Sequence, residues 1–176
     1  MNMMKYIVVV IAALLFTACG KEEEKYKIPS APVSFSIDLG YLDNHLDTGG
    51  NVGIYLKDSN TKKKYDELVS DVKYVKTYLA TRASLTSYAG FSGLLIINIG
   101  DGLSDTPFNV FDLCCPYEDQ ESIRVVPTDN ITLVCPSCQS VYNLYSGARI
   151  SGITSQSLQS YYIKKTGNTS FLVYYP

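Results

Sequence analysis

The chain has 176 residues, of which 46% are hydrophobic, and its formal net charge is −2 at pH 7. This length is enough for one domain with a core of its own and is short for two domains. The small negative charge excludes the basic field that binding to nucleic acid requires, so we expect no polynucleotide partner.

The first residues have the architecture of a secretory signal. Lys5 precedes an apolar run, Tyr6–Phe16, and the small residues Thr17-Ala18 lie directly before Cys19. The run has about half of the ~20 residues that a transmembrane helix needs, so it does not predict a spanning segment. Small residues before a cysteine resemble the lipobox of bacterial lipoproteins. That resemblance implies removal of residues 1–18, lipidation of Cys19 and anchorage in a membrane of the cell envelope, on either face of the outer membrane; a plain signal peptide is the alternative.

Residues 19–31 are charged and then punctuated by prolines, with too little apolar surface to fold alone. They are predicted to be a tether. The acidic run Glu22–Glu24 resembles an export signal for the cell surface, and a solvated linker explains it equally well. The folded domain is therefore expected to span residues 32–176.

The first half of this domain gives mixed signals. Val33–Leu39 alternates apolar and polar residues, and Asn51–Leu56 is a short apolar run, so both are predicted strands. The stretch Leu68–Leu79 is ambiguous, because a helical stripe and β-forming residues overlap in it. Lys62–Lys64 is interpreted as a solvated loop, and His45 as a loop residue without a second metal ligand nearby.

The second half predicts strands more clearly. Gly93–Ile99 and Phe108–Leu113 flank a glycine-containing turn and are expected to form a hairpin-like pair. Short strands separated by turn signals are typical of an all-β sandwich or barrel. The further strands are expected at Ser122–Val126, Ile131–Val134, Leu158–Ile163 and Ser170–Tyr175.

Four cysteines follow Cys19, and they fall in two tight groups. The first group is Cys114-Cys115-Pro116 and the second is Cys135-Pro136-Ser137-Cys138, each directly after a predicted strand. Because a strand fixes where its loop projects, two such loops can close over one metal ion or cluster.

The segments around these loops resemble a Rieske domain, which holds a [2Fe–2S] cluster. The resemblance rests on the strand pair leading into Cys115-Pro116-Tyr117, on the run from Cys135 through Tyr142, and on the glycine step and strand that follow, from about Gly90 to the C-terminus. It implies an all-β fold of small antiparallel sheets with the cysteine loops at strand ends. It also implies that Cys115 and Cys135 occupy the two cysteine-ligand positions, while Tyr117 and Cys138 occupy the positions of the two histidines.

The usual Rieske centre is excluded by counting, because two histidines must bind one iron and His45, far from both loops, is the one histidine in the chain. Four interpretations stay open: an iron–sulfur cluster on Cys115, Cys135 and Cys138 with Cys114 or Tyr117 completing the set, a pair of disulfides, a bound zinc ion, or an empty reduced site. The even number of cysteines and an oxidising address favour disulfides.

No catalytic nucleophile, base or carboxylate pair lies near the loops in the sequence, so we do not expect an enzyme. The sequence leaves a choice between an electron carrier and a structural or binding module. A carbohydrate- or protein-binding β-sandwich lipoprotein is the alternative outside the Rieske family, and nothing in the sequence names its protein or small-molecule partner.

Overall fold

The structure, a computed structural model, describes residues 28–80, 88–100 and 104–175. Its strands form two sheets, which confirms the prediction of an all-β fold. The strands are β1 (Val33–Asp38), β2 (Val52–Leu56), β3 (Val75–Leu79), β4 (Tyr88–Ala89), β5 (Leu94–Asn98), β6 (Phe108–Asp112), β7 (Val126–Thr128), β8 (Thr132–Val134), β9 (Val141–Asn143), β10 (Arg149–Ser151), β11 (Ser160–Lys165) and β12 (Ser170–Tyr174). The described helices are the 3₁₀-helix η1 (Asn44–Asp47) and α2 (Ser59–Leu68).

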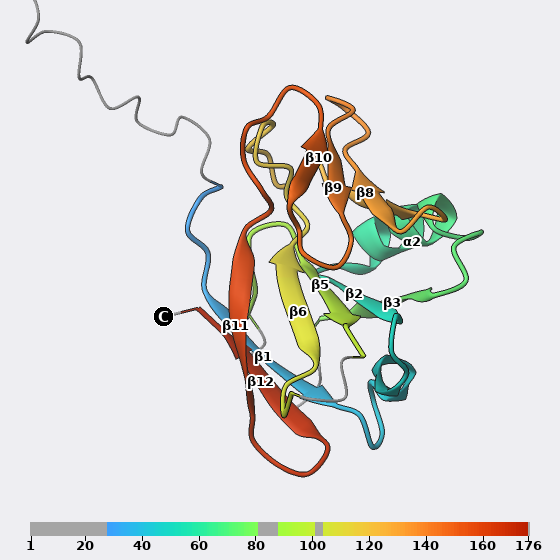
Figure 1. Ribbon diagram of the computed structural model, residues 1–176, viewed down its shortest axis with the longest axis vertical. Coiled ribbons are helices and arrows are strands. Elements are labelled where there is room, and N and C mark those ends of the chain that lie inside the picture. Colours follow the sequence, from blue (N-terminus) through green and yellow to red (C-terminus); the bar gives the residue numbers. More distant parts are fainter. Residues whose placement is uncertain (1–27, 81–87, 101–103, 176) are drawn as a thin grey trace, which may run out of the picture.

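The larger sheet has eight strands in the order β3-β2-β5-β6-β11-β12-β1-β4, and the smaller sheet has four in the order β10-β9-β8-β7 (Figure 1). The chain leaves the larger sheet after β6, builds the smaller sheet, and returns as β11 beside β6, where Ser160 pairs with Phe111. The pairing of β2 with β3 is parallel and the other strand pairs are antiparallel. Both cysteine groups lie within the segment that is inserted between β6 and β11.

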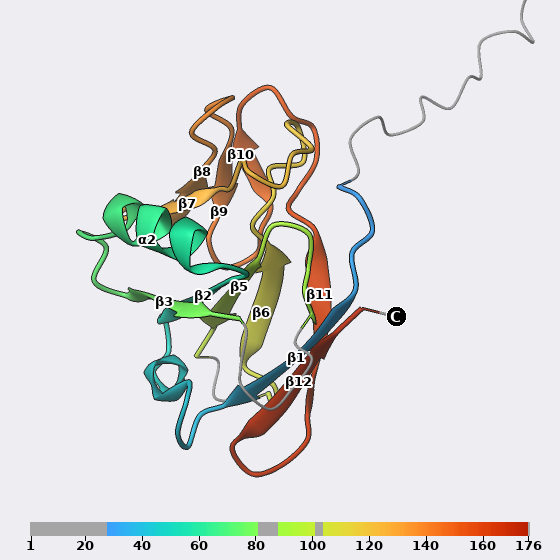
Figure 2. The same ribbon diagram turned by 180° about the vertical axis from the view of Figure 1, so that it is seen from behind.

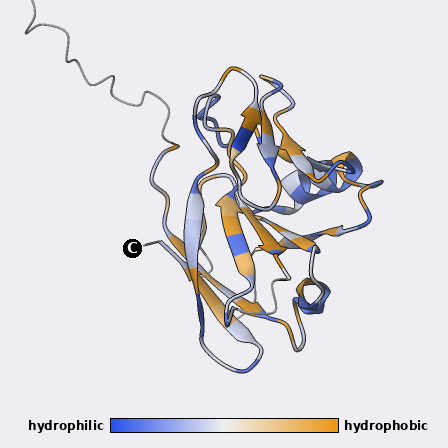
Figure 3. Cartoon of the chain, viewed as in Figure 1, coloured by the Kyte–Doolittle hydropathy of each residue, from blue (hydrophilic) through white to orange (hydrophobic). Residues whose placement is uncertain are grey.

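Strand β5 shows why the larger sheet is buried on both faces. Leu95 and Ile97 point into a first core, which the larger sheet shares with α2 and the smaller sheet. Leu94 and Ile96, which alternate with them, point into a second core closed by β1 and β12. Successive side chains of a strand point to opposite faces, so a continuous apolar run serves both cores. Figure 3 shows the apolar residues concentrated on these strands.

Helix α2 corrects the interpretation of Lys62–Lys64 as a loop, because the three lysines lie within it. Asp58 caps its N-terminus, with a carboxylate oxygen accepting a hydrogen bond from the Thr61 amide at 2.8 Å. Tyr65 is the buried residue of this polar helix, and its hydroxyl donates to the Val125 carbonyl. The helix therefore joins the edge of the larger sheet to the smaller one (Figure 2).

The other predicted elements differ in detail. Strands β1, β2, β5, β6, β8, β11 and β12 lie where strands were expected. The ambiguous stretch ends in β3, so its β-forming residues decide its conformation from Val75 onward. The prediction of a strand at Ser122–Val126 is wrong for most of its length, because β7 begins only at Val126. Strands β9 and β10 were not predicted, and at three residues each they are too short to show a period.

Candidate metal centre

The two cysteine loops are turns of the same kind. In the first, the Asp119 amide donates to the Cys115 carbonyl at 3.1 Å, and in the second the Gln139 amide donates to the Cys135 carbonyl at 3.0 Å. Asp119 and Gln139 both adopt a left-handed backbone, with φ of 50° and 60°. A proline follows the first cysteine of each turn. The two loops therefore share one backbone geometry, in which the fourth residue after the cysteine closes the turn.

Asp112 anchors the first loop to the sheet. One of its carboxylate oxygens accepts hydrogen bonds from the amides of Ser92 at 3.0 Å and Cys114 at 2.8 Å. The other oxygen accepts from the Phe91 amide and the Tyr161 hydroxyl, each at 2.7 Å. Asp112 is fully buried, so this carboxylate needs all of its partners. The start of the loop is thereby fixed against β11 and the turn before β5.

Three of the four predicted thiols meet. The sulfur atoms of Cys115, Cys135 and Cys138 all lie within 4.8 Å of one another, and those of Cys115 and Cys138 are 3.6 Å apart. Cys115 and Cys135 are fully buried, whereas Cys138 is partly exposed. The first comes from the loop after β6 and the other two from the loop after β8. Among the described residues, these three form a cluster that can hold a metal ion, hereafter the thiol cluster.

Cys114 lies outside the thiol cluster, which corrects its place among the candidate ligands. Its sulfur contacts the carbonyls of Cys115 and Gln120, each at 3.5 Å. Adjacent residues on an extended chain point to opposite sides, so Cys114 turns away where Cys115 turns inward. Burial raises the pKa of the Cys114 thiol to about 12. It is a protonated, structural thiol at neutral pH.

The expected pair of disulfides is not present among the described cysteines. All four thiols are free, and the 3.6 Å between Cys115 and Cys138 is well beyond the ~2.05 Å of a disulfide bond. Because Cys114 points away from the other three sulfurs, two disulfides using all four cysteines do not fit this arrangement. The even number of cysteines had favoured disulfides, and the structure does not contain them among the described cysteines.

Tyr117 and His45 take different places. Tyr117 lies on the first turn, partly buried against the first core. His45 lies in η1, so its interpretation as a loop residue needs correction, and its Nε2 is 3.1 Å from the Tyr74 carbonyl. His45 is not part of the thiol cluster.

Two hydroxyl groups complete the surroundings of the sulfurs, and the sequence alone did not identify them. The Tyr142 hydroxyl is 3.4 Å from the Cys115 sulfur, and the Ser140 hydroxyl is 3.1 Å from the Cys138 sulfur. Burial, reinforced by Cys115, raises the pKa of Tyr142, so its phenol stays protonated and can donate a hydrogen bond to a thiolate. In the sequence, both hydroxyl-bearing residues follow Cys138 closely and are two positions apart, and this spacing is the feature that could have indicated them.

The thiols of the second loop titrate differently. Burial raises the pKa of Cys135 to about 12. Burial also acts to raise the pKa of Cys138, but hydrogen bonds with Ser140, Cys135 and Cys115 together outweigh it, and the net pKa is lowered. The pKa values of these two thiols therefore shift in opposite directions, and a cation that binds Cys135 must displace its proton.

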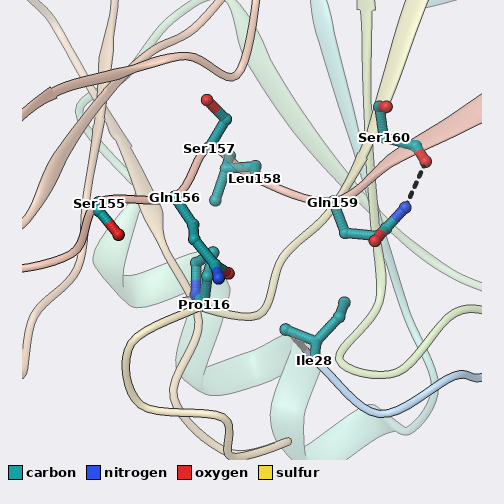
Figure 4. A pocket seen from close by; sticks show the side chains of 8 residues that line it. All are labelled: Ile28, Pro116, Ser155, Gln156, Ser157, Leu158, Gln159 and Ser160. Carbon is teal, nitrogen blue, oxygen red and sulfur yellow. Dashed lines mark hydrogen bonds between the residues drawn. The ribbon is translucent and has the colours of Figure 1, made fainter. Parts of the chain in front are cut away.

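A shallow depression of about 550 Å³ lies beside Pro116 of the first loop (Figure 4), and no cysteine lines it. Its lining is neutral, and the side-chain amide of Gln159 donates a hydrogen bond to the backbone carbonyl of Ser160 at 2.8 Å. The residues around it are Ile28, Pro116, Ser155, Gln156, Ser157, Leu158, Gln159 and Ser160. None of them carries a charge or a thiol, so the depression does not extend the thiol cluster.

No protein-family model, curated protein or solved structure matches this chain. The resemblance to Rieske domains therefore stays a prediction from the sequence. Cys19 and most of the expected tether lie outside the described residues. Within the described ranges, no helix is both long enough and apolar enough to cross a membrane.

Proposed function

We propose that this domain binds one zinc ion through Cys115, Cys135 and Cys138, and that the ion joins its two cysteine loops. The observation that carries the proposal is the spacing of the sulfurs. With Zn–S bonds of about 2.3 Å, two thiolates of a tetrahedral site lie about 3.8 Å apart. The 3.6 Å between Cys115 and Cys138 is close to that value, and Cys135 lies within 4.8 Å of both.

A Rieske-type [2Fe–2S] cluster does not fit the same residues. Such a cluster takes two cysteines on one iron and two histidines on the other. Tyr117 and Cys138 stand where the resemblance implies histidines, and the three sulfurs all lie within 4.8 Å of one another, a spacing that suits one metal ion. The arrangement favours a single thiophilic ion. The role that follows is structural or binding, and electron transfer is not proposed.

The cellular setting is proposed from the sequence. Lipidation at Cys19 would attach the domain to a membrane of the cell envelope, with residues 19–31 as the tether. A metal-linked pair of loops suits that setting, because zinc does not change its oxidation state and keeps its thiolates from oxidation. The domain itself is proposed to be a Rieske-like module adapted to a different metal.

Metal content tests the proposal. The full chain, purified without oxygen in a mild detergent, should contain about one zinc per chain and no visible absorption. Replacing zinc by cobalt(II) should give the blue-green absorption of a tetrahedral site with thiolate charge-transfer bands.

Two cysteine variants provide a matched comparison. Cys138→Ala should lose most of the metal, whereas Cys114→Ala should keep it, because its sulfur points away from the cluster. Iron and sulfide in equal amounts would overturn zinc in favour of a cluster. A wild-type protein with no affinity for zinc or cobalt would overturn metal binding altogether.

A further inference from the structure

The thiol cluster supplies three ligands, and a closed structural zinc site has four. We infer that Glu118 supplies the fourth. This inference rests on the proposed zinc site and names a ligand that the sequence did not indicate. The resemblance to Rieske domains points instead to Tyr117, one residue earlier in the same turn.

The first observation is the common geometry of the two turns. Each begins at a cysteine followed by proline, and each closes when the fourth residue donates its amide to that cysteine's carbonyl, at 3.1 Å and 3.0 Å. The closing residues share a left-handed backbone. Position for position, Glu118 in the first turn therefore corresponds to Cys138 in the second.

The second observation is how the second turn uses this position. Its first cysteine, Cys135, and the residue three positions later, Cys138, both belong to the thiol cluster. In the first turn, Cys115 already belongs to the cluster. A turn of the same shape directs its third following residue, Glu118, to the same side as its cysteine. Tyr117 corresponds instead to Ser137, which is not a ligand in the second turn.

The third observation is the state of the Glu118 side chain. Glu118 is half-buried, although Asp119 and Gln120 after it are exposed. Carboxylates bind zinc at about 2.0–2.2 Å, so the chemistry of Glu118 suits a fourth ligand beside three thiolates. Its carboxylate is not among the atoms that lie within 4.8 Å of one another, so binding requires rotation about its flexible side-chain bonds. A zinc ion with three thiolate ligands still needs a fourth ligand to be tetrahedral, and the bond to a carboxylate oxygen would compensate for that rotation.

Zinc affinity and cobalt spectra of the full chain test this assignment. Glu118→Gln should lower zinc affinity about 10-fold or more, by analogy with the loss caused by weakening a metal site's ligand sphere. Glu118→Cys should raise zinc affinity, and it should increase the thiolate-to-cobalt charge-transfer intensity by about one third, because four thiolates replace three. The affinity is measured by competition with a chromogenic chelator.

Two neighbouring variants serve as controls. Asp119→Asn removes one negative charge from the adjacent exposed residue and should leave both readouts unchanged. Tyr117→Phe should also leave them unchanged. Loss of affinity in Tyr117→Phe with none in Glu118→Gln would assign the fourth position to the phenol and overturn the inference, as would wild-type behaviour of both Glu118 variants. A wild-type protein that binds neither metal would overturn the zinc proposal and this inference together.

Discussion

Asp112→Asn perturbs the group that ties the first cysteine loop to the sheet. An asparagine can place its oxygen where the Ser92 and Cys114 amides donate, and its nitrogen can then donate to the Tyr161 oxygen. The Phe91 amide loses its acceptor in this orientation. The reverse orientation would leave two amides without an acceptor, so the first is preferred.

The expected cost follows from this count. A buried donor without an acceptor costs about 1–3 kcal/mol, and hydrogen bonds to a charged acceptor are worth more than those to a neutral one. We expect Asp112→Asn to lower the free energy of unfolding by about 3 kcal/mol. With a urea m-value of about 2 kcal/mol per molar, the midpoint of unfolding falls by about 1.5 M. The measurement is urea unfolding of the metal-free, reduced full chain at neutral pH.

Zinc affinity separates anchorage of the loop from loss of overall stability. Ile37→Ala, in the second core, should cost about 2–5 kcal/mol and leave zinc affinity unchanged in the folded protein. Asp112→Asn should weaken zinc binding as well, because it loosens the chain two residues before Cys114. A midpoint within error of the wild type, or an equal loss of zinc affinity in both variants, would refute this reasoning.

Three further predictions concern the thiol cluster. Tyr142→Phe should weaken zinc binding about 10-fold in a chelator competition, because it removes the hydroxyl beside the Cys115 sulfur; unchanged affinity would mean that this contact has no role. Gly152→Ala should lower the free energy of unfolding by about 1–3 kcal/mol, measured by urea unfolding, because the φ of Gly152 is 112° and an alanine Cβ would lie 2.4 Å from the Cα of Ser140. A wild-type midpoint would contradict this. Because burial raises the pKa of Cys135 to about 12, zinc binding at pH 7 should release the proton of this thiol, and zinc affinity should fall as the pH falls. Calorimetry in buffers of different ionisation enthalpy should show the proton release. Its absence would contradict a thiolate ligand.

The elements that the sequence predicted well are those with a long, unambiguous pattern. The alternation in β1 and the apolar run of β5 each extend over five or more residues, and each encodes which faces are buried. Helix α2 was missed because it buries one residue, Tyr65, and so has almost no apolar stripe. The three-residue strands of the smaller sheet depend on their neighbours more than on their own residues.

The cysteine loops show the same division. Strand ends marked by cysteine and proline indicated that Cys115, Cys135 and Cys138 meet, and the structure brings their sulfurs together. The direction of Cys114 depends on how the chain continues past β6, which periodicity alone does not decide. Ser140 contacts Cys138 two residues before it in the same loop, whereas Tyr142 reaches Cys115 in the other loop, a contact between distant segments that no local pattern encodes.

The smaller sheet and the thiol cluster lie in one segment inserted into the larger sheet. Its entry and exit lie on neighbouring strands, since Phe111 at the end of β6 pairs with Ser160 at the start of β11. A short reverse turn between these strands would restore an ordinary hairpin in the larger sheet, and the second core would be untouched. Replacement of a cysteine within the inserted segment therefore need not alter the register between β6 and β11. The first core nevertheless includes Cys115 and Cys135, so a replacement at either position must also keep that core packed.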